Sequence, residues 1–383
     1  MGLIKKLNDV ANINMGQSPE SSSYNTEGIG EPFFQGKADF GDMYPSIRMY
    51  CSSPLKKARE KDILMSVRAP VGDVNICNIS CCIGRGLAAI TPIESVLDFK
   101  YLYYYLTLKK EQISNLGTGS TFKAINKSII EHVELPVPTI EIQHKIAILL
   151  DKARELIDKR KEQIDACDEL VKSLFYEIFG DPVTNPKGWE IEPLRNLITE
   201  AKYGSSQKAD ETKGRYPILR MNNITYQGDW DFSDLKYIDL EEKNEEKYLV
   251  EKGDLLFNRT NSKELVGKTA VYVEDEKMAF AGYLIRVRTN ERANTQYISA
   301  FLNSPYGKQT LNNMCKNIVG MANINAQELQ DIMMAVPPIE MQNNFAMIVT
   351  KINEQKKSLK KGLIELENNF QALMQRAFKG ELF

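Results

Sequence analysis

The sequence predicts an α+β fold made of two related domains, each followed by a long helix that packs against the other one. Three observations support this prediction. An apolar pattern with alternating steps of three and four residues runs through 139–179, the same pattern returns 199 residues later, and short strand-like segments precede both copies. A chain of 383 residues is also longer than one ordinary domain, so more than one hydrophobic core is expected.

The apolar pattern places one stripe along each long helix, as in a coiled coil. The first stripe contains Ile146, Leu150, Ala153, Ile157, Arg160, Ile164, Cys167, Val171, Leu174 and Ile178. The second stripe contains Phe345, Val349, Ile352, Lys356, Leu359, Leu363, Leu366, Phe370, Leu373 and Ala377. One such stripe is typical of an ordinary amphipathic core helix. Two stripes in one register favour two helices of about 60 Å that pack on each other, and pairing at the charged positions Arg160 and Lys356 is left open.

A mixed segment of strands and turns precedes the first long helix. KDILMSV (Lys61–Val67) and GRGLAAI (Gly84–Ile90) have the composition of strands, and Phe99–Leu116 has the length and spacing of a helix. A loop that contains glycine follows at 117–123. Pro136 and Pro138 then stiffen the segment that leads into the long helix, and Gly180 is expected to end that helix.

The same order returns after Trp189. KGDLLFNR (Lys252–Arg259) matches KDILMSVR, Ala281–Val287 matches the second strand, and Gln296–Ser304 matches the helix. The chain is therefore divided into a first domain (1–138), a central helix (139–180), a second domain (181–338) and a C-terminal helix (339–383).

Composition excludes several classes of protein. The first domain carries 15 Lys and Arg against 14 Asp and Glu, and residues 180–338 carry 20 against 23, so neither shows the basic excess usual in a nucleic-acid reader unless the positive residues share one face. Six cysteines fit no common zinc motif and are expected to be buried or incidental thiols. No uncharged apolar run reaches the length of a membrane span, and a cytoplasmic protein is expected.

The sequence also lacks the motifs of the enzymes that act on DNA. Asn185-Pro186 continues into Lys187-Gly188, so it does not form the Asn/Asp-Pro-Pro-Tyr/Phe loop of an adenine methyltransferase. No phosphate-binding G-x-x-x-x-G-K-S/T motif occurs, and Gly84-Arg85-Gly86 indicates a close backbone approach beside a strand. Two histidines give no plausible catalytic set, so a non-catalytic protein without a cofactor or metal is expected.

The doubled order of motifs resembles the specificity subunit of type I restriction-modification enzymes over essentially the whole chain. Each motif alone is weak, whereas their repetition is specific. The matching motifs are GQSP at 16–19, SVRAPVGD at 66–73, STFKAIN at 120–126, PTIEIQHKI at 138–146, NRTNSKELVGK at 258–268 and PPIEMQ at 337–342.

The resemblance implies that each domain is a target recognition domain that reads one half of a split site in double-stranded DNA. It also implies that the two helices form an antiparallel coiled coil, which sets the distance between the domains and docks two methyltransferase subunits. Restriction subunits would join through the complex.

Candidate DNA contacts are the side chains that can read base edges or hold phosphates. In the first domain these are Arg48, Arg68, Arg85, Thr118, Ser120, Thr121 and Lys123. In the second they are Arg220, Asn222, Asn223, Arg259, Asn261, Lys263, Tyr283 and Asn323. For each of them, a solvated surface residue or a turn former is the alternative, and Asn126 and Asn325 are expected to cap short helices.

A partner surface is predicted where the apolar stripe of the first helix is wider than a two-stranded coil needs. The extra positions are Ile142, Leu149, Leu156 and Leu170. Two other functions stay open: the specificity chain of a type II enzyme that combines nuclease and methyltransferase, and a scaffold of two protein-binding domains with no role on DNA.

Overall fold

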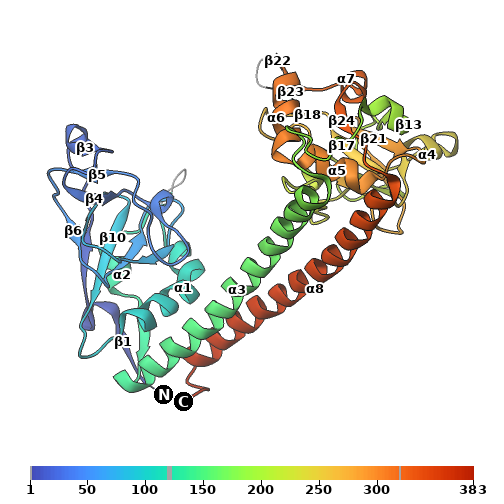
Figure 1. The fold of residues 1–383 in the computed structure, drawn as a ribbon. Coiled ribbons are helices and arrows are strands. Elements are labelled where there is room, and N and C mark those ends of the chain that lie inside the picture. The colour runs from blue at the N-terminus through green and yellow to red at the C-terminus, as the bar shows by residue number, and fades with distance from the viewer. Residues whose placement is uncertain (1, 119–122, 319–320) are drawn as a thin grey trace. The chain divides into compact units, whose positions relative to one another are not determined.

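Each half of the chain places short strands and helices ahead of one helix of 40 residues (Figure 1). The two long helices are α3 (Ile140–Phe179) and α8 (Ile339–Phe378). None of the described helices is apolar over a stretch long enough to cross a bilayer. The computed structural model describes residues 2–118, 123–318 and 321–383.

The described residues form two units that cut through both long helices. The first unit joins Met1–Lys161 to Lys361–Phe383, and the second is Glu162–Lys360. The units therefore differ from a linear division of the chain, because each one holds half of α3 and half of α8.

The first unit is built on a four-stranded antiparallel sheet in the order β2-β10-β7-β8. Its strands are β2 (Ala11–Met15), β10 (Leu87–Pro92), β7 (Ile63–Ser66) and β8 (Val74–Ile76). A mixed sheet, in the order β3-β5-β4-β9-β6, consists of β3 (Tyr24–Asn25), β5 (Tyr50–Cys51), β4 (Glu31–Phe34), β9 (Cys81–Ile83) and β6 (Lys57–Ala58). A separate ribbon pairs β1 (Leu3–Lys6) with β11 (Glu134–Val137).

The helix α1 (Phe99–Asn115) covers the four-stranded sheet and contacts α3 on its other side. Five consecutive residues, 101–105, are buried, because one part of this helix faces the sheet and another faces the long helices. The short elements of this unit are the helix α2 (Lys127–Glu131) and the 3-10 turns η1 (Leu7–Asp9), η2 (Ser21–Ser23) and η3 (Lys37–Asp39).

The second unit repeats this plan with its own four-stranded sheet, β13-β21-β17-β19. Its strands are β13 (Ile198–Tyr203), β21 (Leu284–Thr289), β17 (Leu255–Asn258) and β19 (Thr269–Val271). The mixed sheet, β15-β14-β20-β16, contains β15 (Lys236–Ile238), β14 (Tyr216–Leu219), β20 (Met278–Phe280) and β16 (Leu249–Val250). The remaining strands are β12 (Ile191–Pro193) paired with β24 (Met333–Ala335), and β18 (Thr260–Asn261), β23 (Met321–Asn323) and β22 (Lys316–Ile318) in a third small sheet.

In place of α1, the second unit has two shorter helices, α5 (Thr295–Asn303) and α6 (Pro305–Met314). They are separated at Ser304, which caps α6, and Pro305 then occupies the first turn of that helix, where it needs no backbone partner. The short elements are α4 (Glu242–Tyr248), α7 (Ala326–Gln330), η4 (Leu194–Leu197) and η5 (Met221–Asn223).

Two predicted helix caps are confirmed. The side chain of Asn126 accepts a hydrogen bond from Ile129 N at 3.0 Å, and that of Asn325 accepts one from Glu328 N at 2.9 Å. Both asparagines therefore hold the first turn of a short helix, α2 or α7.

Backbone hydrogen bonds show how the two units correspond, and they correct one sequence match. Asp62 O accepts Cys77 N and Asp254 O accepts Tyr272 N, both at 2.8 Å, so Asp62 corresponds to Asp254. The residue-for-residue match of KDILMSVR with KGDLLFNR is therefore wrong by one position. The residue with positive φ in this turn is Lys61 in one unit and Gly253 in the other. Arg259 therefore corresponds to Val67 and not to Arg68.

A buried glutamine fixes the first turn of α3 to the first unit. The side chain of Gln143 is fully buried. Its Oε1 accepts a hydrogen bond from Asp98 N at 2.9 Å, and its Nε2 donates to Val96 O and Pro138 O, both at 2.8 Å. All three partners are backbone groups in the loop before α1 and in the turn before α3, so one side chain satisfies three otherwise unpaired groups.

Gln342 forms the same contacts at the start of α8. Its Oε1 accepts a hydrogen bond from Asn294 N at 2.9 Å, and its Nε2 donates to Arg292 O at 3.2 Å and to Pro337 O at 2.7 Å. These two glutamines explain the Q that the motifs PTIEIQHKI at 138–146 and PPIEMQ at 337–342 share.

A tyrosine hydroxyl reinforces each junction. Tyr101 Oη donates to Pro136 O at 2.8 Å, and Tyr297 Oη donates to Ala335 O at 2.7 Å. Each bond joins the covering helix of a unit to the strand that leads into the long helix, so the domain and the helix entry are fixed at two points.

The two long helices run side by side in opposite directions within each unit. In the first unit, Ile146 and Leu150 of α3 share a core with Met374 and Ala377 of α8. In the second, the rings of Phe175 and Phe179 lie 6.2 and 5.3 Å from that of Phe345.

Near the C-terminal end of each long helix, residues beside the predicted stripe are buried more deeply than some stripe residues, although Ala377 is buried as the stripe predicted. Phe175 and Phe179 are buried where the pattern placed Leu174 and Ile178, and Met374 is buried where it placed Leu373. The difference arises because these last turns pack against the core of the unit as well as against the other helix.

Both charged positions of the stripe have defined surroundings. Arg160 lies over Gly362 of α8, where an added Cβ would stand 2.1 Å from its Nη1, so the glycine makes room for the guanidinium. Lys356 is buried, and its Nζ contacts Asp168 of α3 and Asp229 of the loop before β15, the latter at 2.6 Å.

Charge pairing keeps the buried Lys356 ionised. Burial by itself lowers the pKa of Lys356, but hydrogen bonds to Asp168 and Asp229 outweigh it, and the net shift is upward. Burial by itself raises the pKa of Asp229, but Lys356 and Lys360 outweigh it, and the net shift is downward. Each group is therefore held in its charged form by the other.

We expect Gln143→Ala and Gln342→Ala each to destabilise the chain by about 2–3 kcal/mol, because each change leaves buried backbone groups without partners. The measurement is the urea midpoint at constant m value. Gln112→Ala, on the exposed side of α1, is the matched control and should leave the midpoint unchanged. Equal midpoints for Gln143→Ala and the control would contradict the structural role of the junction.

We expect Lys356→Ala to cost about 3 kcal/mol at pH 7, because it leaves the carboxylates of Asp168 and Asp229 without their buried partner. Since the folded pKa of Asp229 is depressed, the pair contributes stability above the unfolded pKa of about 4 and loses it as the pH falls through the folded value. The difference between variant and wild type should therefore shrink in acid. Urea titrations at pH 7 and pH 3 test this, and a constant difference would show that packing, not charge, accounts for the loss.

Candidate nucleic-acid interface

Loops of the first unit gather around one end of its four-stranded sheet. Val67 N donates to Gly86 O at 2.9 Å, and Ile125 N donates to Val67 O at 3.0 Å. Arg68 and Thr118 each form a backbone bridge with Ala124. These bonds bring together four of the predicted contacts, which are all exposed: Arg68, Arg85, Thr118 and Lys123. The predicted contacts Ser120 and Thr121 lie outside the described residues.

Glycines allow these loops to touch. A Cβ on Gly86 would lie 2.3 Å from Gln35 O, and one on Gly16 would lie 2.2 Å from Gly84 O. The prediction of a close backbone approach at Gly84-Arg85-Gly86 is confirmed. Arg85 lies between Gly84 and Gly86, and its side chain is exposed to solvent.

Arg48 is attached to the same group of loops through an ion pair. Its Nη2 lies 2.5 Å from the Oδ1 of buried Asp39, whose other oxygen accepts hydrogen bonds from Gln35 N and Gly36 N. The Arg48 side chain remains 58% exposed, so one edge of the guanidinium is engaged and the rest faces water.

In the second unit, five predicted contacts lie around the corresponding end of the sheet. Arg259 N donates to Tyr283 O at 3.0 Å, and Ile324 N donates to Arg259 O at 2.9 Å. Thr260 pairs with Asn323 and Asn261 pairs with Ala322 across β18 and β23. The residues brought together in this way are Arg259, Asn261, Lys263, Tyr283 and Asn323.

The sequence reasoning missed Tyr203, which belongs to this group. The Arg259 guanidinium carbon lies 4.8 Å from the centre of the Tyr203 ring. Tyr203 Oη accepts a hydrogen bond from Ala326 N at 2.8 Å, which fixes the ring. Its only signal in the sequence is a tyrosine followed by glycine at the end of a strand, which is too common to single out.

The Arg220-Met-Asn-Asn segment is less available than the sequence suggested. Arg220 pairs with Asp234 at 2.8 Å. Asn223 is buried, accepts a hydrogen bond from Arg220 N and donates to Asp231 O and Asp234 O. Its amide therefore holds the loop and cannot read a base, whereas Asn222 stays exposed.

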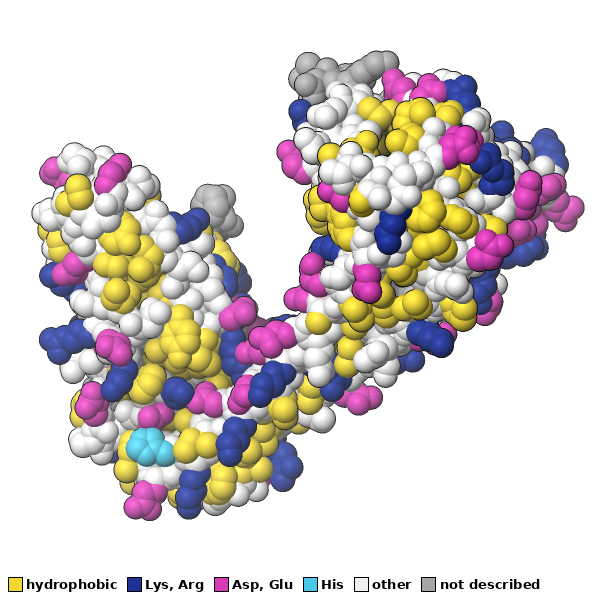
Figure 2. Space-filling model, in the orientation of Figure 1, with side chains coloured by type: hydrophobic (Ala, Val, Ile, Leu, Met, Phe, Trp, Pro, Cys, Tyr) yellow, Lys and Arg dark blue, Asp and Glu magenta, His cyan; other side chains and the backbone are white. Residues whose placement is uncertain are grey.

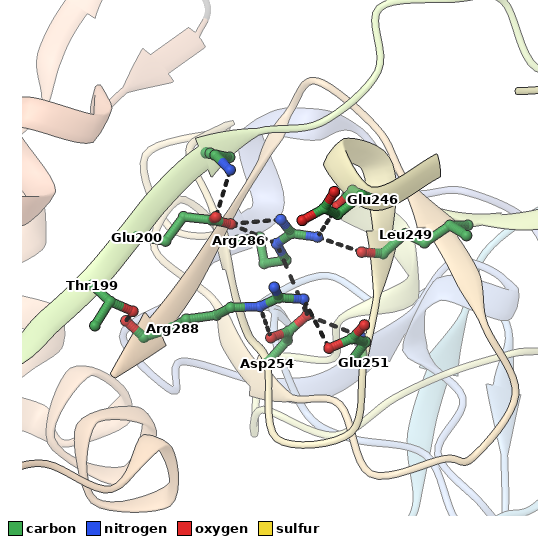
Figure 3. A network of polar contacts seen from close by, with 9 residues as sticks. Thr199, Glu200, Glu246, Leu249, Glu251, Asp254, Arg286 and Arg288 are labelled. Carbon is green, nitrogen blue, oxygen red and sulfur yellow. Dashed lines mark hydrogen bonds and ion pairs between the residues drawn. The ribbon is translucent and has the colours of Figure 1, made fainter. Parts of the chain in front are cut away.

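Behind this surface, a buried ion-pair network fixes the four-stranded sheet of the second unit (Figure 3). Arg286 is 1% exposed and lies 2.5 Å from Glu200, while Arg288 Nε lies 2.7 Å from Asp254 Oδ1. Burial by itself raises the pKa of Glu200, but hydrogen bonds from Lys202 and Arg286 outweigh it, and the net shift is downward. Both arginines are paired with carboxylates and Arg286 is buried, so the network supports the sheet and is not itself a binding site.

The predicted partner residues on α3 differ in exposure. Leu156 and Leu170 are 55% and 49% exposed, and Leu149 is half-buried. On the face drawn in Figure 2, hydrophobic side chains lie among charged ones along both long helices. Ile142 packs against the core of the first unit and lines a cavity with Phe378, so the chain itself covers much of it.

Within the described ranges, no arrangement of side chains suggests catalysis. No group of three His, Cys, Asp or Glu side chains could hold a metal ion. All six cysteines are free and five are buried, as the sequence predicted. The second unit has a cavity of about 390 Å³ near Lys308, whose pKa burial and neighbouring lysines lower to about 8, but a nucleophile paired with a general base is not found there.

Comparison with known proteins identifies the family. The model of the type I restriction modification DNA specificity domain matches residues 4–166 and again residues 186–368. The chain belongs to the type I restriction-modification DNA specificity family. The two matches correspond to the two copies seen in the sequence and in the hydrogen bonding of the two units.

Two relatives bear names of this family, and one solved structure shares the fold. A chain named for the specificity subunit of the type I restriction enzyme MjaX of Methanocaldococcus jannaschii is 48% identical over 162 residues, which is 42% of this chain and 38% of that protein. The type I restriction enzyme EcoKI specificity subunit of Escherichia coli is 25% identical over 79% of this chain and 69% of its own length. The crystal structure of a type I restriction-modification S subunit from M. genitalium shares the fold, with a TM-score of 0.57 at 16% identity over 98% of this chain and 96% of that one.

Proposed function

We propose that the chain is the DNA-recognition subunit of a type I restriction-modification complex, in which each unit reads one half of a bipartite site. The observation that carries this proposal is that the two units repeat one backbone frame but place different side chains at the same end of the sheet. A repeated frame with altered surface residues suits two readers of different sequences.

The chemistry of these surfaces favours DNA over a protein partner. The side chains are mainly arginine, lysine, asparagine and threonine, which contact base edges and phosphates. On the face in Figure 2, basic and acidic side chains are interspersed, and the formal net charge of the chain is -2, so the proposed binding relies on local groups and not on a large positive field. A protein-binding scaffold would present an apolar centre instead.

The long helices would form an antiparallel coiled coil that spaces the units and docks two methyltransferase subunits, through which restriction subunits join. Both helices pass through both units, and Leu156 and Leu170 are exposed apolar positions on α3, with Leu149 half-buried beside them. The chain itself would be non-catalytic and free of cofactors. A partner that combines nuclease and methyltransferase, as in type II systems, is the alternative, and the mass of a co-purified partner separates the two.

Replacing residues 1–138 by the corresponding domain of a relative should change one half of the methylated motif and leave the other half unchanged. The reason is that each unit carries its own reading loops. Methylome sequencing of a host that expresses the chimera with the methyltransferase measures both halves at once. A simultaneous change in both halves would rule out two independent readers.

The purified chain supplies the control for methylation. Without its methyltransferase partner, it should transfer no methyl group to DNA.

The binding of the purified chain to DNA of mixed sequence should weaken as the salt concentration rises, because lysines and arginines release counterions from phosphates. Salt-independent binding, or none, would favour the scaffold.

Lengthening both helices at the chain positions where one unit ends and the other begins should lengthen the unspecified gap of the DNA motif. Four residues inserted after Lys161 in α3, together with four before Lys361 in α8, leave the helix pairing inside each unit unchanged. They add about 6 Å along the axis and about 40° of rotation. At about 3.4 Å per base pair, the gap should grow by one or two base pairs while both half-motifs stay the same.

An insertion in α3 alone is the comparison, because it displaces the pairing with α8 and should reduce activity. The readout for both variants is methylome sequencing. Full activity of the double insertion with an unchanged gap would show that something other than the helices measures the distance.

A further inference from the structure

Arg259 is set apart by the absence of a counterion among the described residues of the second unit. Six of the seven arginines between 162 and 360 contact a carboxylate. These pairs are Arg195–Asp331, Arg215–Glu245, Arg220–Asp234, Arg286–Glu200, Arg288–Asp254 and Arg292–Glu192. Arg259 contacts none, and its buried Nε has no hydrogen-bond acceptor in the described part of the chain.

The position of Arg259 is nevertheless rigid. Its backbone N and O are both used, by Tyr283 and Ile324, and its guanidinium stacks on the fixed ring of Tyr203. A half-buried cation without an acceptor is costly, and such groups in native proteins call for an explanation such as an external partner. The stack holds the plane of the guanidinium while its terminal nitrogens remain to donate hydrogen bonds.

The first unit shows that this arrangement is not needed for the fold. At the positions that correspond to Arg259, Tyr283 and Tyr203, it has Val67, Gly86 and Met15. The same backbone bonds are made, since Val67 N donates to Gly86 O as Arg259 N donates to Tyr283 O. The frame is therefore compatible with small and apolar side chains, and the cation and its two tyrosines are specific to the second unit.

We propose that Arg259 reads a guanine in the half-site bound by the second unit, with Tyr203 as the residue that positions it. This rests on the proposed function. Arginine pairs with the O6 and N7 atoms of guanine through two parallel hydrogen bonds, which is the commonest specific contact in the major groove. Such a pair requires a guanidinium held in one plane, and the tyrosine stack supplies that. A phosphate contact needs only charge, which the exposed Lys263 of the neighbouring turn can provide.

The test uses the complete complex with its methyltransferase and compares methylated motifs from a randomised DNA library. Arg259→Ala should lose discrimination at one guanine position of the second half-motif by about tenfold or more, with the first half unchanged. Arg259→Lys should relax the same position, because lysine keeps the charge but lacks the planar fork.

Arg215→Ala is the matched control. Arg215 also lies over a tyrosine, 5.0 Å from the centre of the Tyr216 ring, but it is paired with Glu245 at 2.9 Å. This variant should leave the motif unchanged, so an effect confined to Arg259 would not arise from loss of a stacked arginine in general.

Several outcomes would overturn the assignment while the DNA-recognition function stands. One is a wild-type second half-motif without a G·C pair. Another is an unchanged motif in the Arg259 variants, with affinity lowered equally for all sequences and a salt dependence reduced by about one counterion, which indicates a phosphate contact. If Arg259→Ala does not fold, Arg259→Lys decides alone, and an unchanged motif in that variant overturns the proposal. A wild-type complex with no sequence preference would instead refute the proposed function.

Discussion

The fold depends on one side chain used twice, the buried glutamine in the first turn of each long helix. Gln143 and Gln342 each join the loop before a covering helix to the turn before a long helix, through one accepted and two donated hydrogen bonds. Without them, the first turn of a 40-residue helix would lose its buried directed bonds to the domain, and apolar contacts resist sliding poorly because they have no fixed direction. Three directed bonds at a buried point set where each helix begins and how it is oriented on its domain.

The charged positions between α3 and α8 give the helix pair a register that apolar residues would not. A seam of leucine and isoleucine tolerates displacement by a turn, whereas Arg160 fits over Gly362 and Lys356 fits between Asp168 and Asp229. Sliding by one turn would place a guanidinium on a side chain and leave a buried ammonium without a carboxylate, at a cost of several kcal/mol. Polar groups at seam positions are known to select register in coiled coils, and the two layers here have that property.

Much of this architecture could be predicted from the sequence, because the apolar residues of a long helix recur at regular steps. The stripe in 139–179 and its copy predicted the two long helices, and the repeat predicted two related domains. The errors have local physical causes. The match between Arg68 and Arg259 was wrong because the left-handed position of a turn is a lysine in one copy and a glycine in the other, which moved the alignment by one residue. The sequence of a loop does not show which way an asparagine amide faces, so the prediction of Asn223 as a surface contact is wrong. The role of Tyr203 arises only because β13 and β17 flank β21 in the folded sheet, which the sequence does not show.

The glutamine junction also has a consequence for how such chains can diversify. On the domain side it binds only backbone groups, at Val96, Asp98, Arg292 and Asn294, and on the helix side only the carbonyls of Pro138 and Pro337. A backbone carbonyl or amide is the same in almost every residue, so the sequence of a domain can be rewritten without altering the acceptors and donor that the glutamine needs. Genetic exchange with a break near the helix entry would then join a foreign domain to a resident helix with the junction intact. The first turn of each long helix can therefore bind different domains through the same backbone hydrogen bonds. New combinations of domains then need no compensating mutations at this junction.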